Sequence, residues 1–202
     1  MNILIISGPS GSGKSSLAHE IAKRKPETYE VVKSVTTRQP REEQEFYTFV
    51  SKETFMEMEK ADAFLESNFY QGSQNFYGTP KESVFRIQKE GKIPILDIDV
   101  NGRKQLIESD HGFDCLSIFV SAPAEILYQR LVGRSETHKS ALKRIKAAID
   151  EIDNSRDYDA FILNFDFETT LSEIDRVIHD ETFRPKQDVD SFIENTITFI
   201  NK

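Results

Sequence analysis

A glycine-rich stretch near the start of the sequence constrains the fold more than any other feature. Residues 8–16 read GPSGSGKSS, directly after the apolar run at 2–6 and directly before the helical spacing of Leu17, Ile21 and Ala22. Glycines let a backbone approach an anion closely, and the N–H groups that open a helix point at it. The pattern G-x-x-x-x-G-K-S, set between a strand and a helix, therefore predicts a phosphate-binding loop (P-loop) for a nucleoside triphosphate.

Two side chains at the end of this loop suit a triphosphate. We expect Lys14 to place its charge beside the β- and γ-phosphates, and Ser15 to offer a hydroxyl oxygen to Mg²⁺. A turn rich in glycine and serine with a chance lysine is the alternative, which the strand–loop–helix setting disfavours. The predicted ATP-binding residues of the loop are Gly8, Pro9, Ser10, Gly11, Ser12, Gly13, Lys14, Ser15 and Ser16.

Apolar strand patterns alternate with helical patterns along most of the chain. Strands are expected at residues 2–6, 31–35, 92–100, 115–120 and 161–163, and helices at 14–25, 101–108, 123–131, 139–152, 169–178 and 190–200. This alternation is typical of an α/β fold whose parallel core sheet is flanked by helices and binds ligands at the carboxyl ends of its strands. Residues 36–91 are polar and rich in aromatic residues, which predicts an insertion with a small sheet of its own.

Composition and charge disfavour several classes of protein. The formal net charge is −8, so we expect no broad basic face for nucleic acid. No apolar run approaches the ~20 residues that span a bilayer, so we expect no membrane association. Cys115 is the only cysteine, which excludes an intrachain disulfide and fits a reducing compartment such as the cytoplasm.

A second set of residues suits a phosphate group. Residues 34–41 read SVTTRQPR, in which Arg38 and Arg41 follow a serine and two threonines. Guanidinium groups bind phosphate through two parallel hydrogen bonds, although a solvated basic loop explains this stretch equally well.

Two carboxylates close the apolar strand LDID. Residues two apart on a strand share one face, so Asp97 and Asp99 can face the same cleft. We expect one of them to hold Mg²⁺ through water and the other to meet the second substrate, and the pattern leaves open which does which. A pair of strand-end aspartates in a turn is the alternative.

Several stretches, taken in order, resemble the guanylate kinase family. They are GPSGSGKSS (8–16), SVTTRQPR (34–41), YTFV (47–50), FLE (64–66), YGT (77–79), LDIDVNG (96–102), RLVGR (130–134) and KR (143–144). The resemblance covers about residues 3–180, and eight ordered matches are far more specific than any one of them. It implies a P-loop kinase with a core, a small α+β GMP-binding subdomain inserted into it, and a lid.

The resemblance implies a GMP site centred on Glu66. Guanine presents N1–H and the 2-amino group side by side, which one carboxylate accepts together, whereas adenine offers no such pair. Glu66 looks like this carboxylate, with Thr79 as its hydroxyl neighbour. Core packing is an equal alternative for Tyr47 and Tyr77. The implied GMP-binding residues are Ser34, Arg38, Arg41, Tyr47, Glu66, Tyr77, Thr79, Asp97 and Asp99.

The resemblance also implies catalytic and metal-binding roles. The arginines of the lid would neutralise charge on the phosphoryl group, although a solvated helix face is the common alternative for arginine. Asn164 corresponds to an asparagine near the family's adenine site, and Ser15 and Asp97 are the implied Mg²⁺ residues. The implied catalytic residues are Lys14, Arg38, Arg130, Arg134 and Arg144.

These assignments divide the chain into three parts. We expect a P-loop core at residues 1–33 and 92–184 with a lid at about 133–143, a GMP-binding insertion at 34–91, and a C-terminal helical tail at 185–202. The tail is expected to pack on the core or on a partner chain, with the protein a monomer or homodimer. The chain departs from the family pattern in the lid, in a shorter segment at 41–47, and in a longer one between Glu66 and Tyr77.

The sequence thus predicts phosphoryl transfer from Mg·ATP to GMP or dGMP, giving ADP and GDP. A non-catalytic guanylate-kinase-like binding module is one alternative, but such modules typically lose the P-loop, and Lys14 and Ser15 are present here. A kinase of the same fold that acts on another phosphorylated small molecule, such as a ribose phosphate, is a second alternative. Glu66 and the YGT motif argue against it, because a sugar has no use for a carboxylate that binds guanine. A GTPase switch needs N-K-x-D, which Asn164 and its neighbours do not supply.

Overall fold

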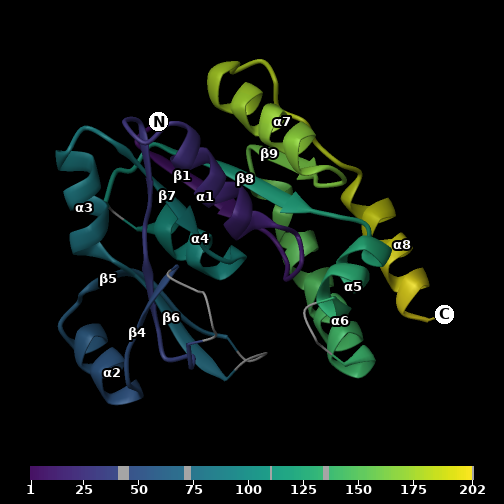
Figure 1. Cartoon of the computed structure of the whole chain (residues 1–202), viewed down its shortest axis with the longest axis horizontal. Coiled ribbons are helices and arrows are strands. Elements are labelled where there is room, and N and C mark those ends of the chain that lie inside the picture. Colours follow the sequence, from purple (N-terminus) through teal and green to yellow (C-terminus); the bar gives the residue numbers. More distant parts are fainter. Residues whose placement is uncertain (41–45, 71–73, 110, 134–136, 202) are drawn as a thin grey trace.

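The computed structural model covers residues 1–202 and describes all of them except residues 41–45, 71–73, 110, 134–136 and 202 (Figure 1). The described residues form a larger sheet of five strands in the order β2-β7-β1-β8-β9, in which every neighbouring pair is parallel. The strands in this order are Tyr29–Val31, Ile93–Asp97, Ile3–Ser7, Cys115–Ser121 and Ala160–Leu163. The expected parallel α/β fold is confirmed.

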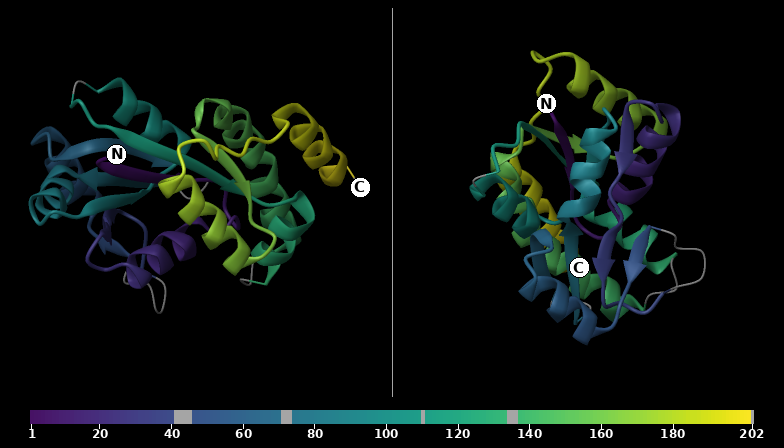
Figure 2. Two further views of the ribbon diagram at one scale, coloured as in Figure 1. Left: turned by 90° about the horizontal axis from the view of Figure 1, so that it is seen from above. Right: turned by 90° about the vertical axis from the view of Figure 1, so that its left-hand side faces the viewer.

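Helices cover both faces of the large sheet (Figures 1 and 2). Among the described residues the helices are α1 (Lys14–Arg24), α2 (Lys52–Lys60), α3 (Lys81–Lys89), α4 (Val100–Glu108), α5 (Ala124–Val132), α6 (His138–Asp153), α7 (Phe167–His179) and α8 (Val189–Ile200), with a 3₁₀ turn at Asn154–Asp157. Of these, α2 packs on a second, smaller sheet instead. Because side chains alternate along a strand, Leu4 and Ile6 pack with α1 and α7, whereas Ile3 and Ile5 pack with α3 and α4. All residues of β1 are buried, which explains its continuous apolar sequence.

A second sheet lies beside the first and, in the part of the chain that the structure describes, has four strands in the order β4-β3-β6-β5. These strands are Tyr47–Phe49, Ser34–Thr36, Asn75–Pro80 and Phe64–Tyr70. β3 is parallel to β4, and β6 is antiparallel to both β3 and β5. Helix α2 closes its apolar side, where Phe55 stacks on Phe64 with ring centroids 4.7 Å apart. All four strands fall within residues 34–91, the bounds expected for the GMP-binding insertion.

The prediction of a single strand at residues 31–35 is wrong, because the chain passes from the large sheet to the small sheet within this stretch. Val31 ends β2 in the large sheet, and Ser34 begins β3 in the small one. The N–H of Val32 still donates to the carbonyl of Ile95 at 2.9 Å, so the large sheet holds the chain up to that residue. The apolar character of the stretch comes from burial in two different sheets.

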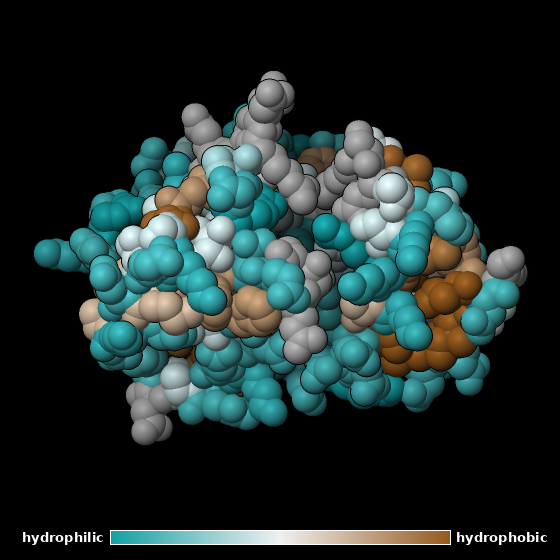
Figure 3. Space-filling model, turned by 90° about the horizontal axis from the view of Figure 1, so that it is seen from below, coloured by the Kyte–Doolittle hydropathy of each residue, from teal (hydrophilic) through white to brown (hydrophobic). Residues whose placement is uncertain are grey.

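The C-terminal helix α8 packs on the core. Val189, Phe192 and Ile193 join the apolar cluster around Phe119, while Phe199 and Ile200 pack against α5 and α6. Figure 3 shows hydrophobic atoms gathered on the right-hand side, where these three helices lie in Figure 1. Within the part of the chain that is described, no helix combines the length and apolar character that crossing a membrane requires.

Candidate active site

The P-loop connects β1 to α1 at the carboxyl edge of the large sheet. Gly13 has φ 90° and caps α1 without a side-chain hydrogen bond, so no side chain of the cap occupies the first N–H groups of the helix. Gly8 lies against β8, where a Cβ atom would sit 1.9 Å from the carbonyl oxygen of Val120. The loop therefore needs glycine at both positions, one for its φ angle and one for space.

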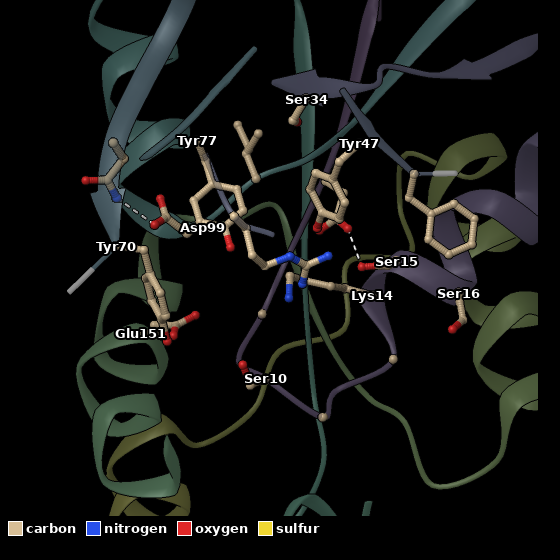
Figure 4. A pocket seen from close by; sticks show the side chains of 18 of the residues that line it. Ser10, Lys14, Ser15, Ser16, Ser34, Tyr47, Tyr70, Tyr77, Asp99 and Glu151 are labelled. Carbon is tan, nitrogen blue, oxygen red and sulfur yellow. Dashed lines mark hydrogen bonds between the residues drawn. The ribbon is translucent and has the colours of Figure 1, made fainter. Parts of the chain in front are cut away.

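One cavity of about 550 Å³ opens in front of this loop. Its walls come from the P-loop, the carboxyl end of β7 with the residues that follow it, the small sheet and α6 (Figure 4). The predicted site residues that line it are Gly8, Ser10, Gly11, Gly13, Lys14, Ser15, Ser16, Ser34, Arg38, Tyr47, Glu66, Tyr77, Asp97, Asp99 and Arg144. Residues more than 130 positions apart in the sequence thus share one cavity, and their contacts with nucleotides remain predictions.

Ser15 and Asp97 form the part of the site that suits a divalent cation. β1 and β7 are neighbours with Ile6 opposite Asp97, so the aspartate lies next to the start of the loop. The Ser15 hydroxyl donates to Asp97 Oδ2, and Asp97 Oδ1 is buried without a hydrogen-bond partner among the described residues. Mg²⁺ takes oxygen ligands, often one or two from the protein with the rest from phosphates and water. These two residues fit Mg²⁺.

The opposite wall offers groups that suit a phosphate. The guanidinium carbon of Arg38 lies 5.1 Å from the centroid of the Tyr47 ring, and Tyr47 packs edge-on against Tyr77. Burial, together with the nearby Asp97 carboxylate, raises the pKa of the Tyr47 hydroxyl, which therefore stays a neutral hydrogen-bond donor. Ser34 is buried at the start of β3 on the same wall. Figure 4 shows Tyr47, Tyr77 and Ser34 around the same space.

Glu66 is the carboxylate buried in this wall. It is 6% exposed, and the hydroxyl of Thr79 donates to its Oε1 at 2.5 Å. Burial raises the pKa of Glu66 to about 7, and the hydrogen bond from Thr79 opposes that shift. β5 and β6 pair Glu66 directly with Thr79, which is why two residues thirteen apart meet. Thr79 contacts the carboxylate rather than the cavity.

Asp99 differs from Asp97 in what it contacts. Its Oδ1 accepts the N–H of Gly102 at 2.8 Å, which caps α4, and its Oδ2 accepts Asn68 Nδ2 at 2.7 Å. Asp97 thus faces the P-loop hydroxyl, whereas Asp99 ties α4 to the small sheet. This geometry favours Asp97 on the metal side and Asp99 on the acceptor side.

Among the described residues, five that the sequence analysis did not single out line the cavity: Phe46, Asn68, Tyr70, Ile98 and Glu151. Asn68 and Tyr70 follow Glu66 at intervals of two on β5, so strand alternation was a usable signal for them. Glu151 lies seven residues after Arg144, two turns further along the same face of α6. Nothing local in the sequence marks the other two.

Helix α6 reaches the cavity through Arg144 and Glu151. Arg144 Nη1 donates to Ser10 Oγ at 3.1 Å, which links the helix to the P-loop. Burial raises the pKa of Glu151 to about 7, and the charge of Lys14 opposes that shift. Figure 4 shows Glu151 beside Tyr70. Burial raises the pKa of the Tyr70 hydroxyl, and the negative charge of Glu151 raises it further.

Some predicted residues lie behind the loop instead of in the cavity. Arg130 donates to the carbonyls of Gly11 and Asn164 at 3.3 and 2.9 Å, and Asn164 Nδ2 donates to the carbonyl of Ser12 at 2.7 Å. Pro9 and Ser12 are buried in the loop itself. These contacts brace the P-loop from its far side. The predicted Arg41 and Arg134, and parts of the segments that depart from the family pattern, lie outside the described residues.

The fold and the cavity together define a P-loop kinase. A phosphate-binding loop at the carboxyl edge of a parallel sheet faces a second small sheet across one cavity, which the hydrogen-bonded Ser15 and Asp97 also line. Comparison with known proteins identifies the group within this class: the sequence model of the guanylate kinase family matches residues 1–181. The chain belongs to the guanylate kinase family.

Individual relatives agree with this assignment. The guanylate kinase of Clostridioides difficile is 40% identical over 185 residues, which covers 89% of this chain and 87% of the relative. That of Escherichia coli K12 is 38% identical over 190 residues, covering 90% and 89%. The crystal structure of guanylate kinase from Anaplasma phagocytophilum superposes with a TM-score of 0.68 at 27% identity, covering 90% of this chain and 86% of that one.

Proposed function

We propose that this protein transfers the γ-phosphoryl group of ATP to GMP, giving ADP and GDP, and that it also accepts dGMP. One observation supports the proposal above all others: a single cavity joins the P-loop to the buried carboxylate of Glu66 and to Arg38. A kinase for a nucleoside monophosphate needs both sites in one space, so that the two phosphates meet. The family membership agrees with it.

The residues of the cavity fit the roles of an in-line transfer. An oxygen of the GMP phosphate attacks the γ-phosphorus, and the bond from that phosphorus to the β–γ bridging oxygen breaks, so that ADP leaves. Lys14 and the loop N–H groups hold the β- and γ-phosphates, while Arg38 and Tyr47 hold the acceptor phosphate. Arg144, which contacts the loop at Ser10, offsets the charge that moves between them.

Mg²⁺, held by Ser15 and by Asp97 directly or through water, would supply charge neutralisation on the ATP phosphates. The protein itself positions the two nucleotides and excludes water from the space between their phosphates. Glu66 binds the two donors on the guanine edge, which fixes the base, and Thr79 fixes Glu66. With base and phosphate both held, the acceptor oxygen is brought to the γ-phosphate in one geometry.

The test is a coupled assay of ADP release with Mg·ATP and a panel of acceptors. The panel contains GMP, dGMP, AMP, CMP, UMP and ribose phosphates. Release with GMP and dGMP alone is the expected result. Release with a different acceptor would make the chain a kinase of the same fold with another substrate. If no acceptor causes ADP release but GMP binding is measurable, the protein is a binding module.

We further propose the setting in which the chain works. Its partners are ATP, Mg²⁺ and GMP, with no nucleic acid, and it acts in the cytoplasm as a monomer or homodimer. The net charge of −8 and the lone Cys115 support this setting. Light scattering with and without the nucleotides measures the oligomeric state, and a tetramer or larger assembly would contradict it.

A further inference from the structure

Gly102 lies in the first turn of α4, beside the carboxylate of Glu66. The helix begins at Val100, and Gly102 is buried where β5 of the small sheet packs against it. Its N–H donates to Asp99, an interaction that any residue except proline can make. Its backbone is helical, so no special φ angle calls for glycine here.

Space is what position 102 lacks. A Cβ atom there would lie 2.5 Å from Glu66 Oε2 and 3.0 Å from its Cδ. Real Cβ atoms do not approach other atoms as closely as the first of these distances. The other oxygen of the same carboxylate is fixed by Thr79 at 2.5 Å. Glu66 is thus held between a hydroxyl on one side and the bare backbone of α4 on the other.

Helix energetics alone favour a different residue at this position. Glycine inside a helix is less favourable than alanine, because it loses more backbone freedom on folding. Alanine would therefore strengthen α4 while crowding Glu66. Glu66 Oε1 is held by Thr79 and the residue is 6% exposed, so relieving the contact with a Cβ would move the carboxylate by about 1 Å within the cavity wall, a displacement that can cost roughly 10²-fold in rate at a site that depends on position.

We infer that Gly102 is a specificity-determining positioning residue: the absence of a side chain in the first turn of α4 sets the place of the Glu66 carboxylate, and with it the selection of guanine. The inference rests on the proposed role of Glu66 in binding the base. Gly102 itself touches no substrate in this scheme.

The experiment compares Gly102→Ala with the wild-type protein on GMP and IMP. IMP keeps N1–H but lacks the 2-amino group, so the ratio of kcat/KM for GMP to that for IMP reports binding to both donors. We expect Gly102→Ala to lower this ratio about 10–100-fold through a higher KM for GMP, with KM for ATP unchanged. Asn101→Ala, the exposed neighbour on the same helix, is the matched control and should leave the ratio unchanged.

Glu66→Gln, alone and combined with Gly102→Ala, separates the two proposals. If Glu66→Gln leaves the ratio unchanged, the role of Glu66 in binding the base is wrong. If Glu66→Gln lowers the ratio but Gly102→Ala does not, the inference about Gly102 is wrong and the role of Glu66 stands. We expect Gly102→Ala to add little in the Glu66→Gln background, because residues in contact are not additive. An equal loss in both backgrounds would overturn the inference.

If Gly102→Ala does not fold, a second variant still tests the contact between position 102 and Glu66. Glu66→Ala removes the atoms that a Cβ at position 102 would meet, so adding it to Gly102→Ala should restore the folded state, as measured by circular dichroism. A double variant that stays unfolded would show that crowding against Glu66 is not the reason for glycine at this position.

Discussion

Replacing Glu66 by glutamine should stabilise the protein at high pH. Burial raises the pKa of Glu66 from 4.5 to about 7, so the folded state binds this proton more tightly than the unfolded chain does. The free energy of unfolding therefore falls as pH rises from about 4.5 to about 7, and the loss is complete above that window. At about 1.4 kcal/mol per pKa unit, the ionised carboxylate costs roughly 3 kcal/mol above pH 7.

Glutamine has the shape of glutamate but carries no charge, so it removes this cost. Its amide oxygen can still accept the hydrogen bond from Thr79. At pH 8 we expect Glu66→Gln to be more stable than the wild type by up to about 3 kcal/mol, or roughly 6–12 °C in Tm for a chain of this size. At pH 4.5 the two proteins should differ by less than about 0.5 kcal/mol, since glutamate is then neutral in the folded state and only about half ionised in the unfolded chain.

Urea unfolding at pH 4.5, 6, 7 and 8 without nucleotides measures the difference. Glu151, whose pKa is also raised to about 7, is present in both proteins and therefore drops out. Glu57→Gln on the exposed face of α2 is the matched control and should stay within about 0.5 kcal/mol at every pH. A difference between Glu66→Gln and the wild type that does not grow with pH would refute the reasoning.

Three further predictions concern the loop, the metal and the tail. Lys14→Ala should lower kcat by about 10²–10³-fold or more with unchanged circular dichroism, because it removes the charge at the transferring phosphates; near-normal turnover would contradict the P-loop assignment. Asp97→Asn should raise the Mg²⁺ concentration needed for half-maximal rate by about 10–100-fold, whereas an unchanged Mg²⁺ titration would remove Asp97 from the metal site. Deleting residues 185–202 should cost roughly 3–6 kcal/mol of stability, since it exposes the clusters that Val189 and Phe199 join, and an unchanged Tm would mean that α8 adds nothing to the core.

The sequence predicted the site better on the core side than on the acceptor side. The P-loop is one continuous stretch between a strand and a helix, so its chemistry can be read locally. The sequence analysis did not predict Asn68, Tyr70 and Glu151 as site residues. Their place in the cavity wall depends on which faces of β5 and α6 point toward the cavity. Arg130 donates to the carbonyls of Gly11 and Asn164, contacts that the sequence could not predict because charge alone does not say which way a helix presents a side chain. Its catalytic role stays a prediction. The division of the chain at residues 34 and 91 remains a prediction.

The sequence by itself determined the elements that rest on short-range patterns. These are the apolar strands, the glycines of the P-loop, and the order of motifs that indicates the family, because each depends on neighbours along the chain. Tertiary structure alone decided how Asp97 and Asp99 differ and why position 102 holds glycine. It also divided the apolar stretch at 31–35 between two sheets. These features arise from contacts between residues far apart in sequence, such as the pairing of β1 with β7 and the packing of α4 against β5. Patterns along the chain do not specify such contacts.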